Sequence, residues 1–222
     1  MTITLLNLYN EIASQPWSMF DNDAKTVDDF DSSLLSAINK SLVELWCSYP
    51  FEFRLKTKTF FIQPCLEKYS LPLGTIKQKE TPKGIQYSVK LSGRLLEFLE
   101  DYKDLEVEVG RPTGFFVEDN KIEFYPTPDK VYRVNVDYYT LAVGYDSNDN
   151  PVYRLDKADD YIDIPEQYSQ LFINALISKV MMYALVDISD DNYTGYNIQY
   201  EKAYKALIKS LGIRKKMRKI NW

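Results

Sequence analysis

The fold is decided by the stretch DIPEQYSQLFINALISKVMMYALVDISDDNYTGYNIQYEKAYKALIKSL, residues 163–211. This stretch has the pattern of two long amphipathic helices joined by a polar turn. Asp163 and Glu166 stand three residues apart, as in a capping box, and Pro165 suits a first turn that needs no amide hydrogen. Residues 187–192 combine Asp, Ser and Asn, which favour turns over helix interiors. The stretch therefore predicts a helical hairpin.

Each predicted helix carries its apolar residues on one face. They recur at steps of three and four, which is the period of an α-helix. Gly212 follows the second run at a position that suits a left-handed C-cap, so we expect the second helix to end there. The apolar residues are Tyr168, Leu171, Phe172, Ala175, Leu176, Val180, Tyr183 and Ala184 in the first run, and Tyr200, Ala203, Tyr204, Leu207, Ile208 and Leu211 in the second.

Two further helices are expected near the N-terminus. Residues 5–12 fit a short helix that ends before Pro16, because proline disfavours the helical conformation of the residue before it. A longer helix begins near Asp31 or Ser32 and is closed by Pro50. Its expected buried face consists of Leu35, Ile38, Leu42, Leu45, Trp46 and Tyr49.

Between these helical regions the apolar pattern changes to a period of two, which is typical of β-strands. Residues 115–125 are expected to form a hairpin around the turn residues 118–121. Residues 126–129, with two prolines, should end the second strand of this hairpin. Residues 93–105 fit either a short helix or a strand, turn and strand. The other alternating runs are residues 53–61, 85–91 and 132–138.

These elements predict an α+β fold, in which N- and C-terminal helices form a bundle and an antiparallel β domain is inserted between them. Consecutive hairpins suggest that this domain is a small sandwich or barrel. The predicted helical scaffold comprises residues 1–52 and 161–222, and the predicted β domain comprises residues 53–160. The β domain ends in a polar loop, residues 144–160, that is rich in Asp and Asn.

Charge is spread unevenly along the 222 residues. From residue 205 onward there are seven basic residues and no acid, so the net charge of −5 leaves −12 on residues 1–204. Apolar side chains alternate with the charges near the end, and a tryptophan is costly to leave in water. The tail is therefore interpreted as a docking segment that becomes ordered on a partner. Its docking residues are Arg214, Lys215, Lys216, Met217, Arg218, Lys219, Ile220 and Trp222.

No residue pattern indicates catalysis, a cofactor or a metal. Histidine is absent, which removes the commonest general base and the commonest metal ligand. Asp146, Asn148 and Asn150 have calcium-loop spacing, but Pro151 and Lys157 stand where such a loop needs glycine and glutamate. Two acidic clusters are interpreted as helix caps: Asp159, Asp160 and Asp163, and Asp187, Asp190 and Asp191. We therefore expect a protein that is not an enzyme.

The sequence also bears on the compartment in which the chain is made. Cys47 and Cys65 stand apart from each other, which favours two buried thiols in a reducing cytoplasm over a disulfide. No apolar run approaches the length that crosses a bilayer, and the first residues lack the pattern of a signal peptide. We therefore expect no membrane partner.

Several short motifs resemble those of phage head-to-tail adaptors. They are Gly110-Arg111-Pro112-Thr113-Gly114-Phe115-Phe116, then Asn120 to Asp129 with Tyr125-Pro126-Thr127-Pro128, then the strand Tyr132 to Tyr139. Trp46, Pro50 and Phe53 at the end of the second helix are similar to the start of the tail tubular protein of short-tailed phages. Ile164-Pro165-Glu166 and Tyr168 resemble its later half, so the likeness covers most of residues 5–210.

The resemblance implies a structural protein of the virion neck or tail, made in the bacterial host cytoplasm. Such adaptors form a ring, commonly of twelve subunits, below the portal protein. The ring continues the DNA channel and seats a tail nozzle or a further ring protein, as in crAss-like phages with stacked rings. Genomic DNA would pass through it without sequence-specific binding.

Two other functions remain open at this point. A DNA-binding module would use the basic tail together with Arg54, Lys56 and Lys58 on one strand face, although the sequence pI near 5.0 argues against it. A β module of a tail fibre, used for receptor recognition, would form trimers.

Overall fold

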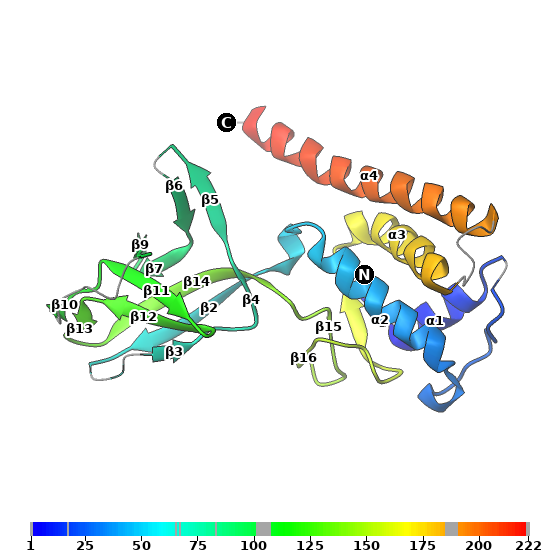
Figure 1. Cartoon of the computed structure of the whole chain (residues 1–222), viewed down its shortest axis with the longest axis horizontal. Coiled ribbons are helices and arrows are strands. Elements are labelled where there is room, and N and C mark those ends of the chain that lie inside the picture. Colours follow the sequence, from blue (N-terminus) through cyan, green and yellow to red (C-terminus); the bar gives the residue numbers. More distant parts are fainter. Residues whose placement is uncertain are drawn as a thin grey trace. The chain divides into compact units, whose positions relative to one another are not determined.

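The chain folds into two compact units, each with its own set of elements (Figure 1). Unit 1 consists of Met1–Tyr49 and Ala142–Trp222, and unit 2 consists of Pro50–Leu141. Helices lie in unit 1 and most strands in unit 2, which confirms the α+β class. The computed structural model describes residues 2–16, 18–64, 66, 68–82, 84–100, 108–184 and 191–220, and no side chains for residues 212–220.

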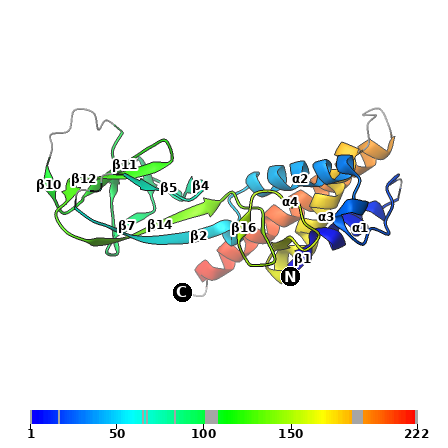
Figure 2. The same ribbon diagram turned by 90° about the horizontal axis from the view of Figure 1, so that it is seen from below.

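Unit 1 is built on the predicted helical hairpin, which the structure confirms. Helix α3 (Glu166–Ala184) packs between α2 (Ser32–Cys47) and α4 (Asp191–Ile220), and α1 (Leu5–Ala13) contacts both α2 and α3 (Figure 2). The side chain of Thr4 caps α1 and that of Asp31 caps α2, as expected for such residues before a helix. Trp46 meets the ring of Phe172 edge-on at 5.9 Å. The α2 face is rotated slightly from the prediction, since Leu34 is fully buried and Leu35 is half-buried.

Both ends of the hairpin differ from the prediction. Asp163 does not cap α3, because it lies in strand β17 (Tyr161–Asp163) and pairs with Thr2 of β1 (Thr2–Thr4). The helix begins three residues later, at Glu166. Gly212 does not end α4, which continues to Ile220. An internal glycine costs about 1 kcal/mol, and the Arg, Lys and Met residues that follow are good helix formers that offset it.

A small sheet with the strand order β1-β17-β15-β16 completes unit 1. Strands β15 (Gly144–Tyr145) and β16 (Pro151–Val152) come from the polar loop, so this loop groups with the helices. Its Leu155 and Ile162 of β17 are fully buried. The units change at residues 50 and 141, whereas the sequence predicts domain boundaries at residues 53 and 160. Whether either division marks an independently folding domain stays a prediction.

Unit 2 is organised by β14 (Tyr132–Thr140), which pairs along its whole length (Figure 1). On one side lies β2 (Leu55–Ile62), and on the other lie β7 (Val89–Leu91) and β4 (Gly74–Ile76), all antiparallel. Val134 and Val136 face inward and are fully buried. The remaining strands of unit 2 are β3 (Lys68–Ser70), β5 (Gln78–Thr81), β6 (Gly84–Tyr87), β8 (Arg94–Leu95), β9 (Glu97–Phe98), β10 (Val109–Gly110), β11 (Gly114–Glu118), β12 (Lys121–Tyr125) and β13 (Thr127–Pro128).

The predicted hairpin of residues 115–125 is confirmed as β11 and β12. Asp119 and Asn120 take φ angles of +49° and +60°, as a two-residue turn between twisted strands requires. The ambiguity at residues 93–105 is resolved in favour of strands β8 and β9 for its first part, and residues 101–107 lie outside the described chain.

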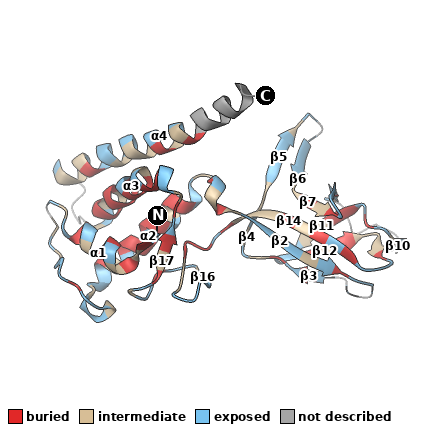
Figure 3. Ribbon diagram, turned by 180° about the vertical axis from the view of Figure 1, so that it is seen from behind, coloured by how far each residue is buried: buried red, intermediate tan, exposed pale blue. Residues whose placement is uncertain are grey.

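The second sheet of unit 2, in the order β3-β12-β11-β9, contributes to one shared apolar core with the β14 sheet. Figure 3 shows the buried residues concentrated inside each unit. The fully buried members of this core are Ile62, Val89, Phe115, Ile122, Val134 and Val136.

Two glycines of unit 1 provide a test of the backbone geometry. Gly195 lies inside α4, where an added Cβ would meet nothing within 4 Å. Gly195→Ala should therefore raise the free energy of unfolding by about 0.5–1 kcal/mol. At Gly144 the added Cβ would lie 2.4 Å from the carbonyl oxygen of Tyr161. Gly144→Ala should therefore lower the free energy of unfolding by about 2 kcal/mol. Urea unfolding measures both variants, and equal urea midpoints for the two would contradict the structure.

Candidate assembly surfaces

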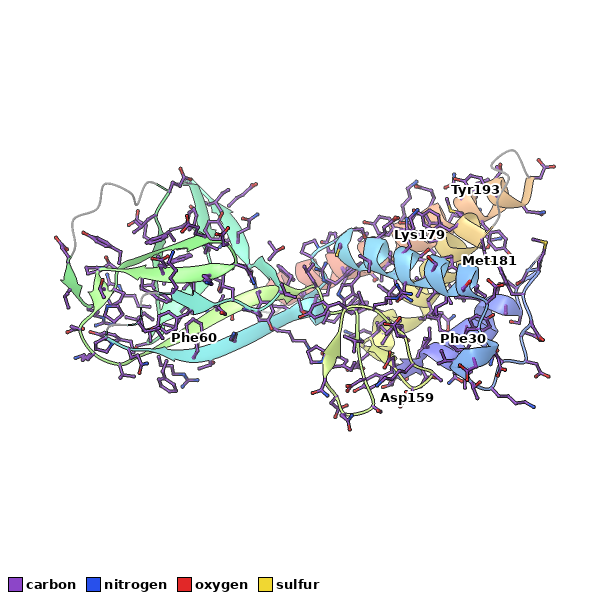
Figure 4. All side chains as sticks on the ribbon, turned by 60° about the horizontal axis from the view of Figure 1, so that its bottom comes forward. Phe30, Phe60, Asp159, Lys179, Met181 and Tyr193 are labelled. Atoms are coloured by element: carbon purple, nitrogen blue, oxygen red, sulfur yellow. The ribbon has the colours of Figure 1, made fainter. Side chains whose placement is uncertain are left out.

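A cluster of charged and aromatic side chains ties α2, α3 and α4 together (Figure 4). The Nζ of Lys179 on α3 lies 2.9 Å from Oε2 of Glu44 on α2, and 4.8 Å from the ring centroid of Tyr200 on α4. The Tyr183 hydroxyl donates to the Glu44 carboxylate, and the Nζ of Lys40 lies 3.9 Å from the centroid of the Tyr183 ring. One lysine thus links three helices, with its charge balanced by one carboxylate.

The cluster alters how its members ionise. Burial raises the pKa of Tyr183, and the hydrogen bond to the Glu44 carboxylate raises it further, to about 12. Burial also opposes ionisation of Glu44, but hydrogen bonds from Tyr183 and Lys179 outweigh it and lower the pKa of that carboxyl. The favoured state is therefore a neutral phenol that donates to an ionised carboxylate.

The loop of residues 144–160 is held to α2 by one asparagine. The side-chain amide of Asn39 donates to the Leu155 carbonyl at 3.0 Å, and its oxygen accepts from the Leu155 amide at 2.8 Å. Asn39 and Leu155 are both buried, so water does not replace these bonds. Asn39 was not identified from the sequence, because its partner lies 116 residues away.

The acidic residues of this loop serve its own turns. Asp146 accepts from the side-chain and backbone amides of Asn150 and from the backbone amide of Asn148, and these bonds lower the pKa of its carboxyl. Asp160 is buried and accepts from the backbone amides of Asp156 and Lys157. It therefore caps a loop turn, and the prediction that it caps a helix is wrong. Within the described residues no three Asp, Glu or Cys side chains are grouped as metal ligands. Asp187 and Asp190 lie outside the described chain, and Asp191 is in the first turn of α4.

The basic strand face considered for DNA binding does not form. Arg54 lies in a 3-10 turn (Glu52–Arg54), where it is buried and donates through Nε to the Thr140 carbonyl at 3.2 Å. The Nζ of Lys58 donates to the Ser70 carbonyl, and only Lys56 of the three is exposed. The prediction of three cations on one face is therefore wrong, because the strand begins after Arg54.

The outer face of the β14 sheet carries a polar network instead. Asp137 accepts from Thr57 at 2.6 Å, from Ser88 at 2.6 Å and from Lys90 at 3.2 Å. Burial opposes its ionisation, but these three donors lower the pKa of the Asp137 carboxyl. This face is thus polar and prearranged, while the opposite face of the sheet forms the core.

The described residues thus form a charged and aromatic cluster on the helices of unit 1 and a polar network on the β14 sheet of unit 2. A family model described as SU10 adaptor protein matches residues 4–220. The chain belongs to the SU10 adaptor protein family. The adaptor is therefore a structural component of a phage virion, and the predicted resemblance to phage adaptors is confirmed. A search of curated proteins finds no match.

The docking tail of the adaptor remains a prediction. The backbone of residues 212–220 continues α4, but the side chains from Arg214 to Ile220, and Trp222 entirely, lie outside the described part.

Cys47 is exposed, so the prediction that it is buried is wrong, and Cys65 lies outside the described residues. Among the described helices, none has the length and apolar character of a membrane span.

The bond between Asn39 and Leu155 can be tested in the adaptor by Asn39→Ala. The variant leaves a buried amide and a buried carbonyl without partners, so the free energy of unfolding should fall by about 3 kcal/mol. Urea unfolding measures the change. Asn148→Ala, at an exposed position of the same loop, is the control and should shift it by less than about 0.5 kcal/mol. Similar losses in both variants would mean that Asn39 does not hold the loop.

Tyr183→Phe tests the ionisation of the helix cluster. It should cost about 1 kcal/mol at neutral pH by removing the bond to Glu44. The raised pKa of Tyr183 stabilises the fold below the ordinary tyrosine value, and this contribution is lost as pH rises from about 10 to about 12. Wild type should therefore lose more stability than the variant across that range in chemical unfolding. Tyr153→Phe, at an exposed tyrosine of unit 1, should follow wild type.

Proposed function

We propose that this adaptor forms a ring below the portal protein, continues the DNA channel into the tail and seats the next tail component. The family match over residues 4–220 carries this proposal. The ring is proposed to contain twelve subunits and to contact the portal on one side and a tail nozzle or a further ring protein on the other. Synthesis in the bacterial host cytoplasm precedes its incorporation into the virion neck or tail.

The composition of the chain supports a ring. A closed ring needs two different contact faces on each subunit, because the contact is head to tail. The chain has 18 tyrosines, and those that are not buried in its core suit such faces, since tyrosine combines apolar area with a polar tip. The charge of −12 on residues 1–204 suits a channel through which DNA slides, because like charges discourage adhesion.

The basic tail is proposed to dock on an acidic surface of the portal. Helix α4 has 30 residues and α3 has 19, and the two run antiparallel (Figure 1). The C-terminal end of α4 therefore extends about 16 Å beyond the start of α3 at 1.5 Å per residue. A helix that projects from its bundle with basic residues near its end presents them to a partner with little loss of backbone entropy on binding.

Deletion of residues 213–222 should abolish docking to the portal and leave the fold intact. Pull-down with the purified portal protein measures docking, and chemical unfolding measures stability. A full-length variant with Arg214, Lys215, Lys216, Arg218 and Lys219 changed to Gln separates the role of charge from that of length, and it should bind at least about tenfold more weakly. If the truncated chain binds as well as wild type, the docking role of the tail is wrong.

Particle imaging of the complex with the portal tests the ring itself. The proposal expects density around a central hole. Three copies without a hole would instead indicate the tail-fibre arrangement.

A further inference from the structure

We propose that neighbouring subunits of the ring contact each other through the outer face of α4 on one copy and an acidic N-terminal loop on the next. The outer face, called the α4 stripe, consists of Ile198, Lys202, Lys205 and Lys209. The acidic loop is residues 18–30. This inference rests on the ring proposed above and names the surfaces that close it.

The α4 stripe lies on the side of the helix that faces away from α3. At about 100° per residue, its four members project roughly 180–240° from Tyr196, which is buried, and Leu207 projects with Tyr196. All four side chains are exposed, and Ile198 retains 49% of its accessible surface. The face thus combines one large apolar residue with a row of cations.

The charge of the stripe is only partly compensated within the chain. Lys205 forms an ion pair at 2.7 Å with Glu201, an exposed residue one turn earlier on the same helix. Across the described residues, this is the one ion pair that any of the three lysines makes. A net positive surface of this kind fits an acidic partner.

The acidic loop offers the complementary composition. Four aspartates and one lysine fall within its thirteen residues, and all five side chains are exposed. Met19 stands beside them with 84% of its surface accessible, the highest exposure among the large apolar side chains described. An exposed methionine flanked by carboxylates matches an exposed isoleucine flanked by lysines. The aspartates are Asp21, Asp23, Asp28 and Asp29.

The loop is held in place before any partner binds. The ring of Phe30 stacks on Tyr9 of α1 at 4.3 Å between centroids (Figure 4), and the Tyr9 hydroxyl accepts from the amide of Asp31. The side chain of Asn10 donates to the Ala24 carbonyl at 3.0 Å. Because these contacts fix the loop, little entropy is lost when it binds.

The same chain cannot satisfy both surfaces. The Tyr196 hydroxyl donates to the Pro16 carbonyl at 2.6 Å, so the chain enters the loop at the inner side of the first turns of α4. The α4 stripe faces the opposite way and extends toward the other end of the helix. The acidic loop therefore meets the stripe of another copy, which is the head-to-tail contact that a ring requires.

Charge reversal in two variants tests this contact. Variant A carries Lys202→Glu, Lys205→Glu and Lys209→Glu, and variant B carries Asp21→Lys, Asp23→Lys and Asp28→Lys. Each alone should assemble on the purified portal at least about tenfold more weakly than wild type, measured by native mass spectrometry at about 0.1 M salt. An equimolar mixture of A and B should assemble, because every contact then joins opposite charges. Lys157→Glu, at an exposed lysine elsewhere in unit 1, is the matched control and should assemble normally.

The outcomes separate this contact from the ring itself. If wild type forms no ring on the portal, the proposed function is wrong. If wild type forms a ring and A and B do so equally well, only the contact proposed here is wrong. Failure of the mixture of A and B overturns it too. If A assembles normally but loses affinity for a DNA duplex in fluorescence anisotropy, the stripe is a nucleic-acid surface and the contact is again overturned.

Discussion

The burial of α3 around most of its circumference is the constraint on which the helical unit depends. One side of the helix is fully excluded from solvent at Phe172, Leu176 and Val180. Other sides are buried at Ile173, Ile177 and Met181. A helix that is apolar over so much of its surface is stable only between neighbours. Helices α2 and α4 provide them, and the pair Lys179 and Glu44 occupies the margin where α3 meets both. The packing of unit 1 therefore follows from the residues of this one helix.

The sequence predicts the elements of this fold better than their ends, for a physical reason. Periodicity over a long segment reports the type of element and part of its buried face, as for α3 and β14. The face predicted for α3 contains the buried Phe172, Leu176 and Val180. It omits Ile173, Ile177 and Met181, which are buried on other sides, and it includes Tyr183, which is 39% exposed. The residue at which a helix or strand ends depends on competition between the local preference of that residue and the interactions that its neighbours offer. Asp163 is a good helix cap, but pairing with Thr2 keeps it in a strand. Gly212 is a good helix stop, but the favourable residues after it prolong α4. Arg54 extends an alternating pattern, yet it turns inward to bond Thr140.

The candidate surfaces also differ in how far the sequence predicts them. The basic tail is visible in the sequence because charge is a property of composition. The bond between Asn39 and Leu155 is invisible there, because a single asparagine gives no signal of a partner more than a hundred residues away. The α4 stripe has a periodic spacing in the sequence. Its meaning depends on which side of α4 packs on α3, and the burial of Tyr196 and Leu207 decides that.

The α4 stripe and the basic tail are proposed to contact different partners in a single assembly, the stripe a neighbouring subunit and the tail the portal. Attraction between exposed charges falls off over about 10 Å at 0.1 M salt, so it acts only where surfaces already approach. An acidic body alone would make identical subunits repel one another. In the proposed ring, cations on the α4 stripe and in the basic tail would turn that repulsion into a preference for one orientation, in which α4 of each copy meets the acidic part of another molecule. Specific orientation, more than affinity, is what a closed ring demands of its subunits.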